Sequence, residues 1–165
     1  GEKDKILKHV PRLDRALRNL DVFDLFGVNV EVTETPGHTL GHICYHIPDE
    51  KILFSGDTLF SIGCGRVFEG TMEQMHTSLQ YLKSLPDDTK IYCGHEYTLA
   101  NLEFALSLDP DDSVIKARYN DVKDLRAKDR PSLPALLGQE KKLNPFLKAD
   151  TARDFASVRQ KKDSF

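Results

Sequence analysis

The sequence predicts an α/β fold, and three of its patterns indicate this class. Residues 22–55 consist of short apolar or alternating runs separated by glycine and proline, which is typical of strands joined by tight turns. A capped amphipathic segment and a brief apolar run within residues 71–93 indicate a helix and another strand. From residue 97 onward the apolar spacing is helical. We therefore expect a layered α/β part followed by a C-terminal helical region.

The first predicted elements are strands joined by short turns. Residues 1–20 are charged and mixed, and Pro11 argues against one continuous helix there. After them Gly27 separates two strand-like runs, which predicts a hairpin. The predicted strands occupy residues 22–26, 28–35, 41–47 and 51–55. Because short turns connect these strands, the sheet should be antiparallel or mixed.

Helices dominate the rest of the chain. Thr71 and Gln74 have the spacing of a capping box and predict a helix from Met72 to about Leu85, followed by a short strand at 90–93. Further helices are expected at residues 97–108, 113–128, 135–139 and 150–163, the last with Asp150 as its N-cap. We expect residues 1–107 to form the α/β part and residues 108–165 to form the helical region.

Composition argues against several classes of protein. The 165 residues suit one domain, or one domain with a small appendage, and the net charge of -3 gives no general electrostatic case for nucleic acid or an anionic membrane. No apolar run approaches the length of a membrane span, and the N-terminus lacks the apolar core of a signal peptide. Three cysteines without C-x-x-C spacing favour a reducing compartment. We expect a cytoplasmic monomer, with a mitochondrial location as the alternative.

Three polar side chains follow predicted strands. His38 comes after a Pro-Gly turn, Asp57 follows Ser55-Gly56, and His95 follows Cys93-Gly94, so each lies on a strand-end loop. Taken alone, His38 would more simply be a hydrogen-bonding turn residue. Taken together, the three form a ligand set suited to zinc or a similar divalent metal, in which the carboxylate can bridge two ions. The three cysteines are better explained as small buried residues than as nucleophiles.

Four ordered motifs resemble those of a known family. They are Thr35-Pro-Gly-His-Thr-x-Gly-His42, Phe54-Ser-Gly-Asp-Thr-Leu-Phe60, Gly63-Cys-Gly-Arg-x-Phe-Glu-Gly70 and Tyr92-Cys-Gly-His-Glu-Tyr-Thr98. Together they resemble the metallo-β-lactamase superfamily and, within it, glyoxalase II, the hydroxyacylglutathione hydrolases. The resemblance implies the second half of an αββα sandwich plus a C-terminal helical region. It also implies hydrolysis of S-2-hydroxyacylglutathione, typically S-D-lactoylglutathione, to glutathione and a 2-hydroxy acid by a hydroxide bound to two metals, a step of methylglyoxal detoxification.

The same resemblance implies roles for individual residues. The implied metal ligands are His38, the bridging Asp57 and His95, with two zinc ions expected and iron or manganese possible. The implied contacts to the glutathione thioester are Arg66, Phe68, Tyr97, Arg159 and Lys162. The last two are three residues apart and therefore share a helical face. Many family members have tyrosine in place of Phe68, so one hydrogen bond to the ligand is in question. His42 is assigned a supporting role.

One motif of the superfamily, His-x-His-x-Asp-His, is absent from this sequence and would precede Gly1. We therefore expect the chain to be a fragment of a longer protein that alone binds metal poorly and hydrolyses little. Besides a lactonase or other superfamily hydrolase, which the basic C-terminal helix argues against, two alternatives remain open at this point. One is a persulfide dioxygenase with a single iron, which shares the His/Asp/His scaffold. The other is a truncated, non-catalytic chain.

Overall fold

The computed structural model describes residues 1–3 and 13–165 and has a mixed six-stranded sheet beside five helices. The sheet order is β1-β2-β3-β4-β7-β8. Its strands are β1 (Val22–Leu25), β2 (Val28–Glu34), β3 (Ile43–Ile47), β4 (Ile52–Gly56), β7 (Lys90–Cys93) and β8 (Ala135–Leu136). A separate two-stranded sheet contains β5 (Leu59–Phe60) and β6 (Gly63–Cys64). The α/β class is confirmed, whereas the expectation about Pro11 lies outside the described residues.

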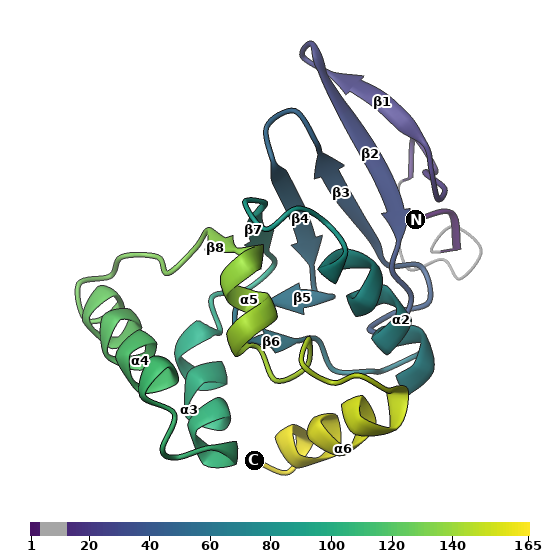
Figure 1. Ribbon diagram of the computed structural model, residues 1–165. Helices are drawn as coiled ribbons and strands as arrows, with labels where there is room; N and C mark the ends of the chain where they lie inside the picture. Colours follow the sequence, from purple (N-terminus) through teal and green to yellow (C-terminus); the bar gives the residue numbers. More distant parts are fainter. Residues whose placement is uncertain (4–12) are drawn as a thin grey trace.

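The helices are α2 (Met72–Lys83), α3 (Thr98–Leu108), α4 (Ser113–Arg126), α5 (Leu137–Leu143) and α6 (Ala152–Asp163). They gather at one end of the molecule, and the β1–β2 hairpin projects from the other end (Figure 1). α2 packs against α6, and α3 packs against α4. No helix in residues 1–3 and 13–165 is long and apolar enough to cross a bilayer.

The predicted hairpin and mixed sheet are both present. Phe26 (φ 55°) and Gly27 (φ 85°) are left-handed, the geometry of a two-residue turn whose twist matches that of the flanking strands. β2, β3 and β4 pair antiparallel in succession, whereas β4 and β7 pair parallel. A parallel pair needs a crossover connection, and α2 lies within it. As a result β2, β4 and β7 all run in the same direction.

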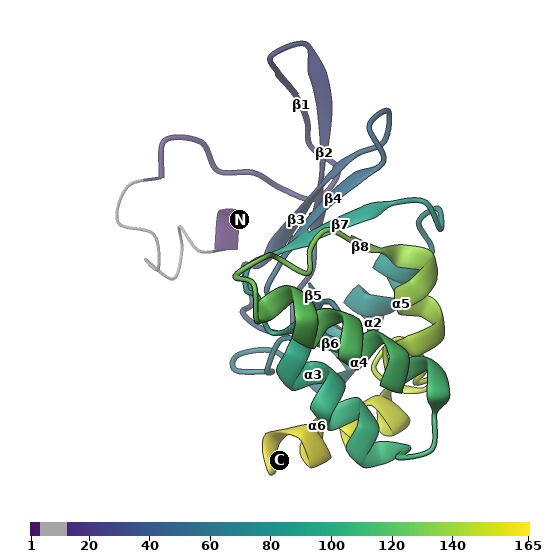
Figure 2. The same ribbon diagram turned by 90° about the vertical axis from the view of Figure 1, so that its left-hand side faces the viewer.

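α2 forms where the capping box predicts it. The Thr71 hydroxyl accepts the Gln74 backbone N–H, and the Gln74 side chain accepts the Thr71 N–H. The apolar stripe of α2 packs on the face of β4 and β7 that carries Leu53 and Ile91. α5 lies on the same side of the sheet (Figure 2). The neighbouring side chain, Phe54, is 43% exposed because alternate strand residues face opposite sides.

Two predictions in the C-terminal half need correction. The helix expected at 135–139 begins only at Leu137, because Ala135 and Leu136 form β8 on the open edge of β7 and so pair its backbone groups. The N-cap of α6 is Thr151 rather than Asp150, since the Thr151 hydroxyl accepts the Asp154 N–H at 3.1 Å.

Candidate metal and substrate site

The strand directions bring the three predicted ligands together. His38 follows β2, Asp57 follows β4 and His95 follows β7, and these codirectional strands end at the same edge of the sheet. One Asp57 oxygen, Oδ2, lies 3.4 Å from His38 Nε2, and the other, Oδ1, lies 3.4 Å from His95 Nε2. The carboxylate therefore stands between two imidazoles and presents one oxygen to each.

The hydrogen bonding of His38 fixes which ring nitrogen can act as a ligand. Its Nδ1 lies 2.8 Å from the Arg66 backbone oxygen, and because a carbonyl only accepts, Nδ1 carries the proton. In the neutral ring Nε2 then points a lone pair towards the Asp57 carboxylate. A metal cation between Nε2 and the carboxylate would bind both groups, and a backbone carbonyl behind the ring is the usual support of a metal-binding histidine. The donor set fits a divalent metal.

Glycines at three positions allow close packing around Asp57. A Cβ on Gly94 would lie 2.4 Å from Asp57 Oδ1, and one on Gly65 would lie 1.9 Å from the Asp57 backbone oxygen. Gly56 has φ +49°, a conformation that suits glycine at the end of β4. Asp57 is thus closely packed against Gly65 and Gly94, while its partly exposed carboxylate faces the cavity.

His42 lies behind Asp57 and does not face the ligand oxygens. Its Nε2 accepts the Asp57 backbone N–H at 3.0 Å. Its Nδ1 lies 2.9 Å from the Thr35 hydroxyl and 3.0 Å from the Thr58 hydroxyl. These contacts use both ring nitrogens, so His42 orients the aspartate loop and has no lone pair left for a metal.

Glu96 fixes the loop on the other side of the site. Its carboxylate accepts the Ser132 hydroxyl at 2.6 Å and the Ser132 backbone N–H at 2.8 Å. Partial burial acts to raise the pKa of Glu96, but the hydrogen bonds from Ser132 and Thr98 outweigh burial and hold that pKa below its ordinary value. The residue after His95 is thereby tied to the segment before β8.

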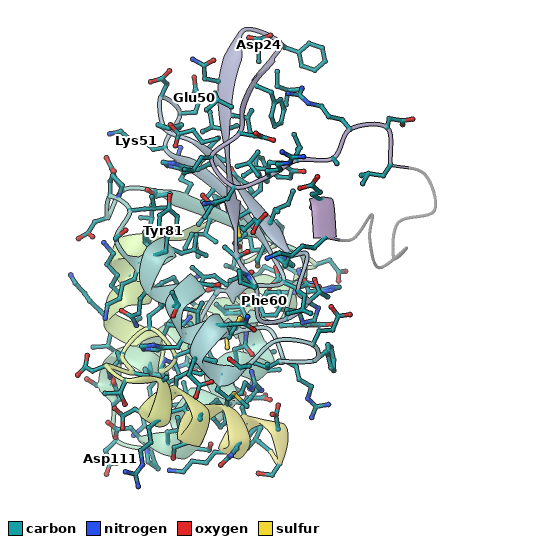
Figure 3. The ribbon with its side chains drawn as sticks, turned by 90° about the vertical axis from the view of Figure 1, so that its right-hand side faces the viewer. Asp24, Glu50, Lys51, Phe60, Tyr81 and Asp111 are labelled. Atoms are coloured by element: carbon teal, nitrogen blue, oxygen red, sulfur yellow. The ribbon has the colours of Figure 1, made fainter. Side chains whose placement is uncertain are left out.

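A cavity of about 350 Å³ lies over the two imidazoles. It is lined by His38, Asp57, Phe60, Gly65, Arg66, Phe68, His95 and Tyr97. Aromatic rings form much of its wall, since Tyr97 stacks on His95 with centroids 4.8 Å apart and Phe68 lies 5.1 Å from His38. Phe60 was not among the predicted site residues, although its place at the end of the Phe54–Phe60 motif could have indicated it. In Figure 3 it lies midway along the molecule, far from Asp24 and Asp111 at opposite ends.

Two predicted contact residues do not line this cavity. Arg159 is 5% exposed and donates to the Cys64 backbone oxygen at 3.1 Å and to Asp163. Lys162 donates to the Ala100 backbone oxygen at 3.1 Å. Burial, together with the nearby positive charge of Arg159, lowers the pKa of Lys162. Their role at the ligand stays a prediction.

The described residues hold two half-sites rather than one closed metal cage. Among residues 1–3 and 13–165, no group of three or more His, Cys, Asp or Glu side chains could hold a metal ion. Each Asp57 oxygen has one imidazole partner, whereas zinc in proteins usually takes four ligands. Cys44, Cys64 and Cys93 are free thiols, and burial raises the pKa of the first two to about 11 and about 12.

Comparison with known proteins divides the chain into two family matches. Residues 3–95 match the metallo-beta-lactamase superfamily, and residues 96–165 match the hydroxyacylglutathione hydrolase C-terminus. The matches meet at residues 95 and 96. The predicted division at residues 107 and 108 stays a prediction.

Two similar proteins carry the same name. The chain is 46% identical over 179 residues to a hydroxyacylglutathione hydrolase of Rhizobium meliloti, with 100% of the chain and 70% of that protein covered. It is 52% identical over 152 residues to a hydroxyacylglutathione hydrolase of Rhodopseudomonas palustris, with 92% of the chain and 60% of that protein covered. The chain therefore spans between 60% and 70% of the length of these two relatives.

Solved structures share the fold. The crystal structure of ETHE1 from Myxococcus xanthus superposes with a TM-score of 0.61 at 24% identity, covering 87% of this chain and 50% of that one, and at this identity it shows the fold alone. TTHA1623, solved in a di-iron-bound form, has a TM-score of 0.54 at 27% identity, covering 83% of this chain and 50% of that one. By sequence and by fold, the chain belongs to the hydroxyacylglutathione hydrolase family of the metallo-β-lactamase superfamily, whose members bind divalent metal.

Proposed function

We propose that the protein to which this chain belongs hydrolyses S-2-hydroxyacylglutathione, typically S-D-lactoylglutathione, to glutathione and a 2-hydroxy acid. The observation that carries the proposal is the pair of imidazoles facing the two oxygens of Asp57 beneath a cavity lined by Arg66 and Tyr97. Relatives of the same family bear the name of this activity.

Three residues of the site would hold the metal ions. His38, Asp57 and His95 would hold two ions, and zinc suits their nitrogen and oxygen donors, with iron or manganese as alternatives. When bound, divalent metal ions polarise a thioester carbonyl and lower the pKa of a water molecule. The enclosing glycines and His42 keep the Asp57 carboxylate in place between the ions.

The cavity wall supplies the substrate contacts. The Arg66 guanidinium is the best partner for the glycine carboxylate of glutathione, because charge-assisted hydrogen bonds to carboxylates are strong. Tyr97 carries a hydroxyl that can reach the same ligand, and Phe68 offers an apolar ring without one. Arg159 and Lys162 would contribute positive charge from α6.

We further propose that the 165-residue chain alone holds metal weakly and turns over slowly. One carboxylate oxygen and one imidazole per ion leave two of the four positions of a four-coordinate zinc to other donors. A non-catalytic chain is the extreme form of this outcome. The family match over residues 96–165 favours the hydrolase over the persulfide dioxygenase alternative.

The test uses the protein expressed from its complete gene, loaded with zinc or with iron. We expect loss of the S-D-lactoylglutathione thioester without oxygen consumption, and its near abolition in Asp57→Asn. Asp124→Asn, which removes a carboxylate from the exposed surface of α4, is the matched control. Oxygen-dependent turnover with iron, or full thioesterase activity in Asp57→Asn, would contradict the proposal.

A further inference from the structure

One carboxylate at the end of α6 holds two guanidinium groups from distant parts of the chain. Asp163 Oδ1 accepts Arg159 Nε at 3.1 Å and lies 3.0 Å from Arg159 Nη2. The same oxygen accepts Arg66 Nε at 3.2 Å, and the Asp163 backbone oxygen accepts Arg66 Nη2 at 3.4 Å. Asp163 therefore links α6 to the loop that forms one wall of the cavity.

Arg159 has little left to offer a ligand. Two of its three nitrogens face Asp163, and Nη1 donates to the Cys64 backbone oxygen at 3.1 Å. Its guanidinium also lies 5.0 Å from the centre of the Phe146 ring. Because the side chain is almost wholly buried, moving the guanidinium away from these contacts would leave a buried positive charge without a partner, which costs free energy. The contacts of Arg159 therefore hold the Asp163 carboxylate in place.

Arg66 combines this contact with access to the cavity. Its side chain is 53% exposed and lines the cavity beside His38 and Tyr97. Asp163 occupies the edge formed by Nε and Nη2, and Nη1 has no hydrogen-bond partner among the described residues. A planar guanidinium can bind one carboxylate along one edge and another carboxylate with its remaining donors, which an ammonium group does less specifically.

The cluster formed by Arg66, Arg159 and Asp163 keeps a net positive charge. The two guanidinium groups carry two positive charges against the single negative charge of Asp163, and Arg66 is the member of the cluster that lines the cavity, across from the Asp57 carboxylate. We propose that Asp163 is a positioning residue that fixes the Arg66 guanidinium for a substrate carboxylate, while Arg159 holds Asp163 in place. This inference rests on the proposed function and names a residue through which α6 acts on the ligand.

The test compares two probes by calorimetric titration. S-methylglutathione carries a free glycine carboxylate, and its glycine ethyl ester does not. We expect the parent chain to bind the free acid more tightly than the ester. Asp163→Asn should bind the free acid about tenfold more weakly than the parent does, a loss of about 1.4 kcal/mol, because Arg66 is no longer held in position for the charge-assisted hydrogen bond. Ester binding should be unchanged. In an Arg66→Gln background, Asp163→Asn should cause no further loss.

Controls separate positioning from general damage. Asp124→Asn should leave both affinities at the parent value, and thermal unfolding should show that each variant folds. The Arg66 Nε–H signal in ¹⁵N NMR should move in Asp163→Asn. If Asp163→Asn does not fold, Arg66→Gln, which keeps the Arg159–Asp163 pair, must itself abolish the preference for the free acid.

Several outcomes would overturn the inference. Equal affinity of parent and Asp163→Asn for the free acid would refute it and leave the proposed function standing. An equal loss for the free acid and the ester would reduce Asp163 to a structural residue. A parent chain that binds neither probe would overturn this inference, whereas the proposed function is tested separately by the S-D-lactoylglutathione hydrolysis of the whole protein.

Discussion

Replacing Gly94 with alanine places a methyl group where the Asp57 carboxylate now lies. The added Cβ would be 2.4 Å from Oδ1, and ordinary van der Waals contact begins near 3.4 Å, so the oxygen must move by about 1 Å. Neither backbone can easily yield, since the Gly94 N–H donates to the Gly56 oxygen at 2.8 Å and His42 holds the Asp57 N–H. The carboxylate itself must rotate away from the line joining the imidazoles.

A displacement of this size exceeds the tolerance of a metal–ligand bond, which is about 0.2 Å. We expect Gly94→Ala to weaken zinc binding about 10- to 100-fold. The measurement is a zinc titration followed by the ¹⁵N signals of the His38 and His95 rings, which reports weak binding directly. Gly138→Ala is the control, because its Cβ would also meet a neighbour, Asp87, at 3.0 Å but far from the ligands. Parent-like zinc binding in Gly94→Ala would refute the reasoning.

Three further predictions concern stability and reactivity. His42→Ala removes the acceptor of the Asp57 N–H and should lower the free energy of unfolding by about 1–3 kcal/mol in urea denaturation. Because the pKa of Glu96 is lowered in the folded state, its contribution is full above the ordinary value of 4.5 and is lost as pH falls through the folded pKa. The stability gap between the parent and Glu96→Gln, measured by unfolding across pH, should therefore close in acid. Burial and high pKa values predict that Cys44 and Cys64 resist iodoacetamide at pH 8, as mass spectrometry of the folded chain will show.

Local signals in the sequence predict much of the fold. The capping box at Thr71 starts α2 at the expected residue, because its hydrogen bonds lie within four residues of one another. The hairpin at Gly27 forms for the same reason, since the turn requires positive φ at that position. The convergence of His38, Asp57 and His95 is also predictable, because codirectional strands end at one edge.

Features that depend on residues far apart in the sequence cannot be predicted from local patterns. The strands β5, β6 and β8 are two residues long and therefore have no periodic pattern to detect. Arg159 is expected to contact the substrate, yet it is buried against a carbonyl oxygen 95 residues away. Its burial follows from how α6 packs. The role of Asp163 cannot be predicted for the same reason, because its partner Arg66 lies 97 residues away in the sequence.

Zinc bound to the crystalline chain and located by anomalous scattering tests the central claim most directly. Two ions should flank Asp57, one between His38 Nε2 and Oδ2 and the other between His95 Nε2 and Oδ1. The ions should lie about 3.5–4 Å apart, as in other two-metal hydrolases. Zinc coordinated by His42, or no zinc at Asp57 at saturating concentration, would contradict the account.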